Sequence, residues 1–178
     1  MKKLAATILS AAFAIGAVCA LTACSGEAKT KIIPVALSSE QYGIAVKKGN
    51  TALLNEINGV LSELTGDGVT VDGKKVTFQS IYEAEVQAEF PISIGEVKTV
   101  STDRSKEFVV ATNAEFAPFE YMVGDSFGGI DVQVAKIIAD KLGKTLVISH
   151  MDFEAVIEAV ASDKADAAMA GLTINEDS

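Results

Sequence analysis

The sequence predicts an α/β fold with a mostly parallel sheet, and two patterns in the second half of the chain indicate it. Three short apolar runs of strand type, at residues 108–112, 146–149 and 167–170, alternate with two amphipathic stretches of helical period. The continuous apolar character of residues 108–112 is typical of a strand that is covered on both faces. The order strand, helix, strand, helix, strand therefore favours right-handed crossovers between parallel strands.

Two helices are expected between these strands. Their apolar residues recur at steps of three and four, so each helix presents one apolar face. Asp131 and Asp152 stand where a capping side chain would begin each helix, and Gly143 stands where the first helix would end. The apolar faces consist of Val134, Ala135, Ile138 and Leu142 in the first helix, and Phe153, Val156, Ile157, Val160 and Ala161 in the second.

A strand and a helix are also expected earlier in the chain. Residues 42–46 form a short apolar run of strand type. From residue 53 to residue 64 apolar side chains recur at helical spacing, and Gly66 and Gly68 follow, which predicts an amphipathic helix that ends there.

Residues 69–106 are expected to form a β-hairpin, a short helix and a linker. Asp-Gly at residues 72–73 favours a tight turn between strands at 69–71 and 76–78. Residues 80–90 predict a second short helix. Residues 91–106 mix Gly, Ser, Thr and charged residues without a period, which is typical of a linker.

The amino terminus predicts export and lipidation. Lys2 and Lys3 precede an uncharged apolar run at residues 4–23, as in a signal peptide. The run ends in Leu-Thr-Ala-Cys, which resembles a bacterial lipobox, so residues 1–23 are expected to be removed and Cys24 to be acylated, with palmitate among its lipids. A retained transmembrane anchor and an ordinary cleaved signal remain as alternatives. Lipidation predicts an extracytoplasmic location at the membrane.

Composition limits the partners and cofactors of the remaining 155 residues. This length suits one compact domain, which residues 24–31 would tether to the membrane. The part after residue 23 carries 13 Lys and Arg against 24 Asp and Glu, a net charge of −11, which argues against nucleic acid as a partner. Because Cys19 lies in the signal, Cys24 is the only mature thiol, so no disulfide, cysteine-based metal site or cofactor is expected.

Four motifs in the second half resemble a known family. They are VVATNAEFAPFEY, GGIDVQVAKIIADKLG, MDFEAVIEAV and DAAMAGLTIN, which follow one another within residues 108–175. This segment resembles the amino-terminal half of the first lobe of amino-acid-binding proteins from ABC importers, the bacterial extracellular solute-binding proteins of family 3. The resemblance implies a three-layer α/β/α periplasmic-binding-protein-like lobe.

The first half resembles the same family in an inverted order. YGIAVKKGNTALLNEINGVLSELTGDG and SIYEAE, between residues 42 and 85, are similar to its carboxyl-terminal end. The implied organisation is a circularly permuted or truncated single lobe. Residues 32–90 would supply the carboxyl-terminal part of lobe one, residues 91–106 the linker and residues 107–178 the amino-terminal part.

A ligand site is expected where the parallel strands end. Asn113, residues 150–153 and residues 171–173 each follow a predicted strand, and open α/β sheets bind ligands at that edge. The resemblance implies the same edge, because the family positions that line the cleft match Phe116, Phe153, Ala170, Gly171 and Thr173. Aromatic rings would enclose the aliphatic part of a ligand.

Two positions depart from the family pattern. The resemblance implies that relatives which recognise a basic or amide side chain often carry an acid where this chain has Asn113, so the neutral amide argues against a lysine or arginine ligand. The family places an arginine that grips the ligand carboxylate about where Ser178 stands, and losing such a partner costs on the order of 2–5 kcal/mol. His150, the only histidine, lacks metal-binding companions and is expected at the surface or at the end of a strand.

Three functions are compared. The first is the solute-binding lipoprotein of an amino-acid ABC transporter, which binds a polar amino acid and passes it to a permease. The second is an incomplete single-lobe relative with weak or no binding that pairs with another chain. The third, ranked last, is an enzyme similar to cyclohexadienyl dehydratase. No catalytic residue is predicted, and self-association through Phe116 and Phe153 is expected.

Overall fold

The computed structural model describes residues 41–88 and 91–174. The expected signal peptide, Cys24, the tether and Ser178 lie outside these residues. Among the helices within the described ranges, none is long and apolar enough to cross a membrane.

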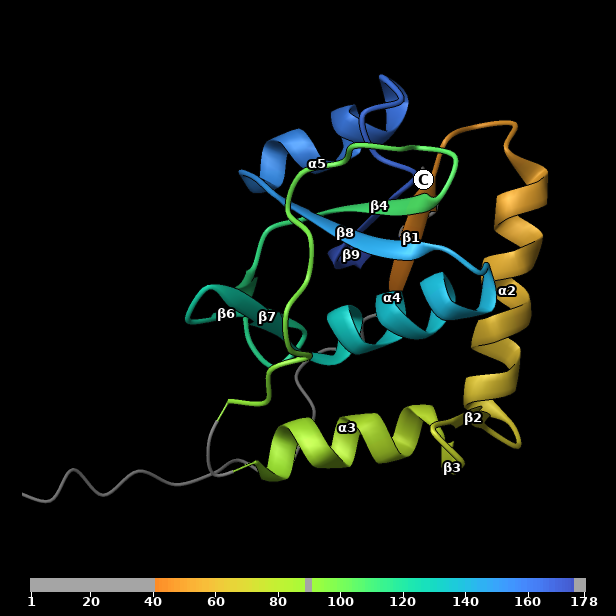
Figure 1. Cartoon of the computed structure of the whole chain (residues 1–178), viewed down its shortest axis with the longest axis vertical. Helices are drawn as coiled ribbons and strands as arrows, with labels where there is room; N and C mark the ends of the chain where they lie inside the picture. Colours follow the sequence, from red (N-terminus) through yellow and green to blue (C-terminus); the bar gives the residue numbers. More distant parts are fainter. Residues whose placement is uncertain (1–40, 89–90, 175–178) are drawn as a thin grey trace, which may run out of the picture. The chain divides into compact units, whose positions relative to one another are not determined.

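A four-stranded sheet forms the centre of the fold, in the order β1-β9-β4-β8 (Figure 1). The central strand β4 pairs in parallel with β8 and with β9, whereas β1 pairs antiparallel with β9 at the edge. This arrangement confirms the predicted α/β class with a mostly parallel sheet. The strands are β1 (Tyr42–Val46), β4 (Glu107–Thr112), β8 (Thr145–His150) and β9 (Ala167–Thr173).

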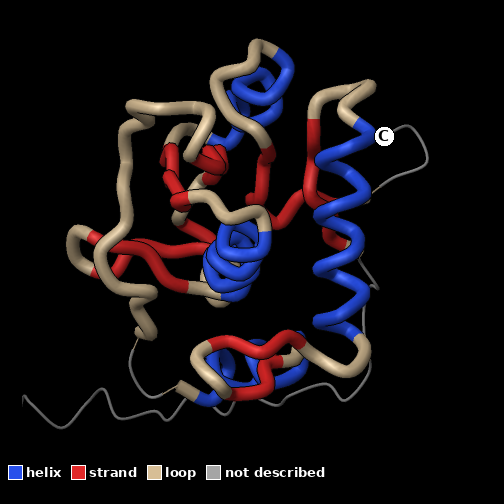
Figure 2. The backbone as a smooth tube through the Cα atoms, turned by 45° about the vertical axis from the view of Figure 1, so that its right-hand side comes forward, coloured by secondary structure: helices blue, strands red, loops and turns tan. Residues whose placement is uncertain are grey.

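Helices cover both faces of the sheet, which gives three layers. Alternate residues of a strand point to opposite faces, and Val110 accordingly joins the core beneath α4 while Val109 joins the core beneath α5. Figures 1 and 2 show α5 on the opposite side of the strands from α4. The helices are α2 (Thr51–Thr65), α3 (Phe78–Gln87), α4 (Ile130–Lys141) and α5 (Phe153–Ala161).

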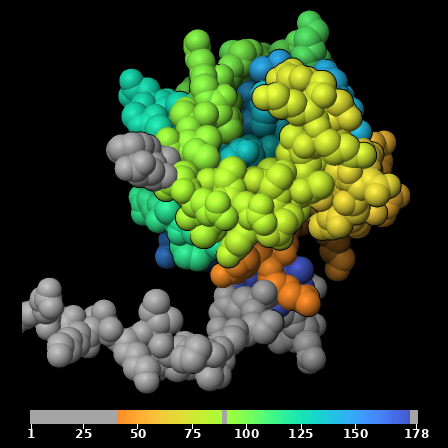
Figure 3. Space-filling view, turned by 90° about the horizontal axis from the view of Figure 1, so that it is seen from below, coloured from red at the N-terminus to blue at the C-terminus, as the bar shows by residue number. Residues whose placement is uncertain are grey.

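The α4 side of the sheet holds the larger core. Ile57 of α2, Ile81 of α3 and Ile138 of α4 are each at most 2% exposed and belong to one apolar cluster. Seen from below, the yellow to yellow-green atoms of residues 66–88, which include α3, form the near surface (Figure 3). The two halves of the chain therefore share one core.

The predicted hairpin forms, but its second strand lies two residues earlier than expected. β2 (Val69–Val71) pairs with β3 (Lys74–Val76) across the Asp-Gly turn. Thr77 then caps α3, because its side chain accepts a hydrogen bond from Ser80 N while the Ser80 hydroxyl accepts one from Thr77 N. This capping box makes Phe78 the first residue of a helix rather than part of the strand.

A second small sheet was not predicted. Its three antiparallel strands have only two to four residues each, too few to show a period in the sequence. They are β5 (Glu115–Phe116), β6 (Glu120–Val123) and β7 (Ser126–Gly128).

The predicted side-chain caps of α4 and α5 are wrong. Gly129 occupies the position before α4, and Asp131 lies inside the first turn, where its carboxylate accepts a hydrogen bond from Gly171 N instead. Asp152 occupies the capping position of α5, but its side chain makes no capping hydrogen bond. Sequence spacing located the start of α5, whereas α4 begins at Ile130, two residues earlier than a cap at Asp131 would place it.

The predicted linker packs against the sheet over its described part. Ile94 N donates to Phe127 O at 3.0 Å, and Lys98 forms a parallel bridge with Val147 of β8. The segment therefore extends the protein surface rather than crossing open solvent.

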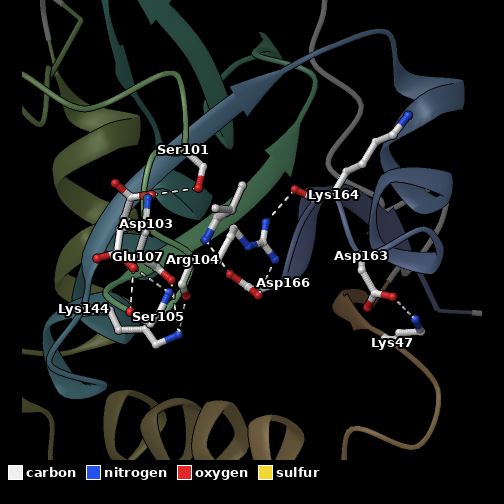
Figure 4. Close-up of polar contacts among 11 residues, drawn as sticks. Lys47, Ser101, Asp103, Arg104, Ser105, Glu107, Lys144, Asp163, Lys164 and Asp166 are labelled. Carbon is white, nitrogen blue, oxygen red and sulfur yellow. Dashed lines mark hydrogen bonds and ion pairs between the residues drawn. The ribbon is translucent and has the colours of Figure 1, made fainter.

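Polar contacts fasten the end of this segment to the amino-terminal ends of the strands (Figure 4). Glu107, only 1% exposed, accepts hydrogen bonds from the backbone N–H groups of Thr102 and Asp103 and from Ser101 Oγ at 2.7–2.9 Å. Lys98 Nζ lies 2.8 Å from the same carboxylate. Lys98 and these donors hold the pKa of Glu107 far below its usual range.

A second ion pair ties the same loop to β9. Arg104 Nη2 lies 2.7 Å from Asp166 Oδ1, and Arg104 Nη1 donates to Lys164 O. Asp166 Oδ2 in turn accepts from Val109 N at 2.8 Å. These contacts lie at the sheet edge opposite the predicted ligand site, so they serve the fold.

Candidate functional site

The carboxyl ends of β4, β8 and β9 lie along one edge of the sheet. Thr112, at the end of β4, pairs in register with His150, at the end of β8. The antiparallel strand β1 begins at this edge, where Tyr42 pairs with Thr173 of β9. We call this edge the rim.

Hydrogen bonds fix the loop after β4 to the loop after β8. Asn113 Nδ2 donates to Met151 O at 3.1 Å, and His150 Nδ1 accepts from Ala114 N at 3.1 Å. Met151 N also donates to Thr112 O at 3.0 Å. Asn113 therefore lies at the rim with its amide donor engaged by the protein.

Three aromatic rings gather at the rim. Phe119 stacks on Phe116 at a centroid distance of 5.4 Å and meets Tyr42 edge-on at 4.9 Å. Phe116 is 45% exposed and Tyr42 38% exposed. The cluster thus combines internal packing with ring area that a ligand could contact.

The backbone of β9 bulges next to these rings. Between the paired positions 43 and 45 of β1 lies one residue, whereas three residues separate their partners, Leu172 and Ala168. Gly171 lies inside this bulge with φ +55°, and a Cβ added there would lie 2.8 Å from the Phe116 ring. Bulges of this kind re-aim the side chains that follow them.

A cavity of about 820 Å³ opens beside the bulge, between α2, α5 and the edge strand β1. Its size and predominantly apolar lining are typical of small-molecule sites. Six of its lining residues are Tyr42, Leu54, Phe153, Ile157, Gly171 and Thr173.

Two carboxyl groups lie next to each other behind the rim. Glu120 of β6 is 1% exposed and is hydrogen-bonded to Asp131 of α4, which accepts from Gly171 N at 3.2 Å. Burial, and then the neighbouring Asp131 charge, raise the pKa of Glu120 to about 9. Burial also raises the pKa of Asp131. At neutral pH the pair therefore holds at least one proton.

The predicted site residues separate into three groups. Phe153, Gly171 and Thr173 line the cavity together. Phe116 contacts the outside of the bulge, and Asn113 lies at the rim over the β4–β8 loops. Ala170 is 3% exposed and its side chain packs in the core beneath α5, which leaves its backbone for any polar contact.

Sequence reasoning missed Tyr42, Glu120 and Asp131 as parts of this region. Tyr42 opens the apolar run at residues 42–46, but the run gives no sign that its strand is antiparallel and therefore begins at the rim. Glu120 stands between Phe119 and Tyr121, and a carboxyl group in an aromatic run was a usable signal of a buried acid.

Across residues 41–88 and 91–174, no group of three or more His, Cys, Asp or Glu side chains is placed to hold a metal ion.

An open α/β sheet with a cavity and exposed aromatic rings at the carboxyl ends of its strands defines a ligand-binding domain. Comparison with known proteins agrees. Residues 108–178 match the family of bacterial extracellular solute-binding proteins, family 3. The match spans the elements from β4 to β9 and does not include β1, α2 or α3.

The chain covers only part of its relatives. It is 35% identical over 79 residues, 44% of this chain and 31% of the relative, to the arginine-binding extracellular protein ArtP of Bacillus subtilis. It is 34% identical over 67 residues, 37% of this chain and 25% of the relative, to cyclohexadienyl dehydratase of Pseudomonas aeruginosa.

One similar solved structure is the amino-acid ABC transporter substrate-binding protein AbpA of Streptococcus pneumoniae bound to L-arginine. The identity is 42%, the match covers 41% of this chain and 32% of that chain, and the TM-score is 0.39.

Proposed function

We propose that this chain is the solute-binding lipoprotein of an amino-acid ABC transporter and that it binds a polar amino acid at the rim. The observation that carries the proposal is the meeting of Phe153, Gly171 and Thr173 in one cavity at the carboxyl ends of parallel strands. The family of residues 108–178 and the name of the relative ArtP support an amino acid as the ligand.

The rim offers complementary groups for such a ligand. Phe116, Tyr42 and Phe153 present exposed ring area that would pack against an aliphatic chain. The Thr173 hydroxyl and the backbone beside Ala170 would bond the polar ends. Because Asn113 already donates to Met151 O, its role would be to hold the loop and offer its carbonyl oxygen.

We propose that the protein works outside the cytoplasm, at the cell membrane. Acylated Cys24 would hold the domain at the outer side of the cell membrane, where it would deliver ligand to a permease. Replacing Cys24 with serine should release the protein from the membrane fraction and abolish palmitate labelling. A variant that stays membrane-bound and unlabelled would instead favour a retained transmembrane anchor.

A second candidate is an incomplete lobe that binds weakly and pairs with another chain. The cavity beside the edge strand β1 favours it. The resemblance implies an arginine that grips the ligand carboxylate about where this chain has Ser178, and a serine there would also favour weak binding.

A dehydratase activity ranks last. The relative named cyclohexadienyl dehydratase raises it, but Glu120 lies buried behind the rim and is engaged with Asp131 rather than open to a substrate. We therefore propose a binding protein and no catalytic residues.

Calorimetry with L-arginine, L-histidine and L-glutamine tests the proposal. We expect micromolar binding of one of them by the purified monomer, and about tenfold weaker binding by Thr173→Val, which removes one hydrogen bond. Thr70→Val on the exposed face of β2 is the matched control. Absence of binding together with dimer formation would support the second candidate, and turnover of a cyclohexadienyl acid would support the third.

A further inference from the structure

We propose that Glu120 and Asp131 are positioning residues for the rim, which hold the β9 bulge at Gly171 through a hydrogen-bonded carboxyl pair. The expected change in ligand affinity rests on the proposed function. The expected change in the structure of the bulge does not rest on it, because the bulge can be studied without ligand.

The bulge needs a partner from outside the sheet. Gly171 lies in the stretch where three residues of β9 face a single residue of β1, so its N–H leaves the regular ladder. Its donor is satisfied by Asp131 Oδ2, at 3.2 Å. This N–H is part-buried, and losing its acceptor there is costly, so Asp131 makes this backbone path favourable.

Asp131 is itself held in place from two directions. It lies in the first turn of α4, and its own N–H donates to Phe119 O at 2.8 Å. Its side chain is hydrogen-bonded to Glu120, the residue that follows Phe119. Helix α4, strand β6 and the bulge of β9 are thereby joined through one pair of carboxyl groups.

The pair works as a link only while it carries a proton. Glu120 is 1% exposed, its Oε2 has no hydrogen-bond partner among the described residues, and the charged group that faces it is Asp131. Two adjacent carboxylates in such surroundings repel each other. With Glu120 protonated, its O–H donates to the Asp131 carboxylate, which accepts from Gly171 N on its other side.

The bulge in turn sets the positions of the rim residues. A Cβ built on Gly171 would lie 2.8 Å from the Phe116 ring, so backbone and ring are in close contact. Two residues further on, Thr173 pairs with Tyr42. Loss of the carboxyl link should therefore move the aromatic cluster and the Thr173 hydroxyl together.

Amide NMR of the ligand-free protein tests the link. Because burial raises the pKa of Glu120 to about 9, we expect the Gly171 and Thr173 amide signals of the wild type to move between pH 7 and pH 10. Glu120→Gln keeps a donor toward Asp131 and cannot ionise, so its signals should stay constant over this range. Glu115→Gln, at an exposed neighbouring position, is the control and should titrate like the wild type.

A second variant and a ligand measurement complete the test. Asp131→Asn weakens the acceptor for Gly171 N and should shift the same amides already at pH 7. L-arginine serves as the probe, and its affinity for the wild type should be equal to that of Glu120→Gln at pH 7 and about tenfold weaker at pH 10. Because arginine itself titrates in the same way with both proteins, its own titration cancels when their affinities are compared at the same pH.

The outcomes separate the two proposals. Failure of the wild type to bind L-arginine, L-histidine or L-glutamine would count against the proposed function, while the amide titration would still decide the role of the pair. Identical amide titrations in the wild type and Glu120→Gln, or unchanged Gly171 and Thr173 amides in a folded Asp131→Asn, would overturn the positioning role.

Discussion

At the residue scale, Gly171 carries two separate constraints. Its φ of +55° is strained for residues with a Cβ, and a Cβ would also lie 2.8 Å from the Phe116 ring. We therefore predict that Gly171→Ala lowers the free energy of unfolding by about 2–3 kcal/mol, combining backbone strain and the displaced ring. Urea unfolding measures the loss.

A glycine with a similar positive φ, but with no atom close to the position of an added Cβ, provides the control. Gly124 has φ +61°, and a Cβ there would have nothing within 4 Å. Gly124→Ala should cost only about 1 kcal/mol of backbone strain. Equal losses in the two variants would show that Phe116 does not press on the bulge.

Glu107 should make the stability of the folded protein depend on pH in the acidic range. Its pKa is held below the usual value in the folded protein, so its stabilisation is complete above the pKa of the unfolded chain and is lost as the pH falls toward the folded value. We predict that Glu107→Gln lowers the urea midpoint clearly at pH 7 and that the difference from the wild type shrinks by about pH 3.

The exposed substitution Glu56→Gln, on α2, serves as the control for this pH series. It should follow the wild type at both pH values. A Glu107→Gln difference that stays constant down to pH 3 would contradict the assignment of the lowered pKa.

At the scale of elements, sequence pattern predicted the long segments and not the short ones. The helix from Thr51 to Thr65 and the strands that begin near residues 108, 146 and 167 repeat their apolar period often enough to be recognised. Strands of two to four residues, such as Glu115–Phe116, cannot show a period. The second strand of the hairpin was misplaced because the Thr77 capping box takes Phe78 into a helix.

The sequence predicted only those site residues that lie at the ends of strands whose direction it also predicted. Parallel strands bring Asn113, Phe153 and Thr173 to one edge, and the sequence pattern carried that information. Tyr42 reaches the same edge because β1 runs antiparallel to β9, a pairing between residues more than 100 positions apart. The Glu120–Asp131 pair likewise depends on tertiary packing that no local pattern encodes.

One tyrosine connects α3 to the small sheet. Tyr121 Oη of β6 donates to Glu85 Oε2 at 2.6 Å and accepts from Ile92 N at 3.0 Å. Tyr121→Phe would leave both groups without this partner, and we predict a loss of about 1–3 kcal/mol in the free energy of unfolding. The substitution should also accelerate amide hydrogen exchange more in α3 than in α5.

Tyr82→Phe is the matched control, because Tyr82 lies on α3 and is 42% exposed. It should change stability by less than about 0.5 kcal/mol. Uniform acceleration of exchange in α3 and α5 by Tyr121→Phe would argue that the tyrosine supports the whole fold rather than the docking of α3.

At the scale of the molecule, the two halves of the chain complete one sheet. The first half supplies β1, the edge strand beside β9, and α2 packs with α4 in one core. We propose on this basis that residues 32–90 and 107–178 are the two exchanged parts of a single lobe. A rearranged gene that places residues 41–88 after residue 174 should then yield a folded protein with a similar circular dichroism spectrum and cooperative unfolding.

We predict that the protein self-associates through exposed apolar side chains at and beside the rim. Phe153 and Ile157 are each 50% exposed and line the cavity that borders the edge strand β1. Phe116 is 45% exposed and lies next to Gly171, which also lines this cavity. Exposed apolar patches favour contact between copies. With 13 basic against 24 acidic residues after residue 23, charge repulsion opposes that contact.

Association should therefore increase with ionic strength, because salt screens the repulsion and leaves the apolar attraction. We predict a monomer–dimer equilibrium by sedimentation that shifts toward dimer between low salt and about 0.5 M NaCl. Ile157→Lys should hold the protein monomeric, whereas Val100→Lys, at a 71% exposed position in the predicted linker, should behave like the wild type. A wild type that remains monomeric in high salt would mean that the exposed rim is too small to bind a second copy, and would weaken the single-lobe pairing candidate with it.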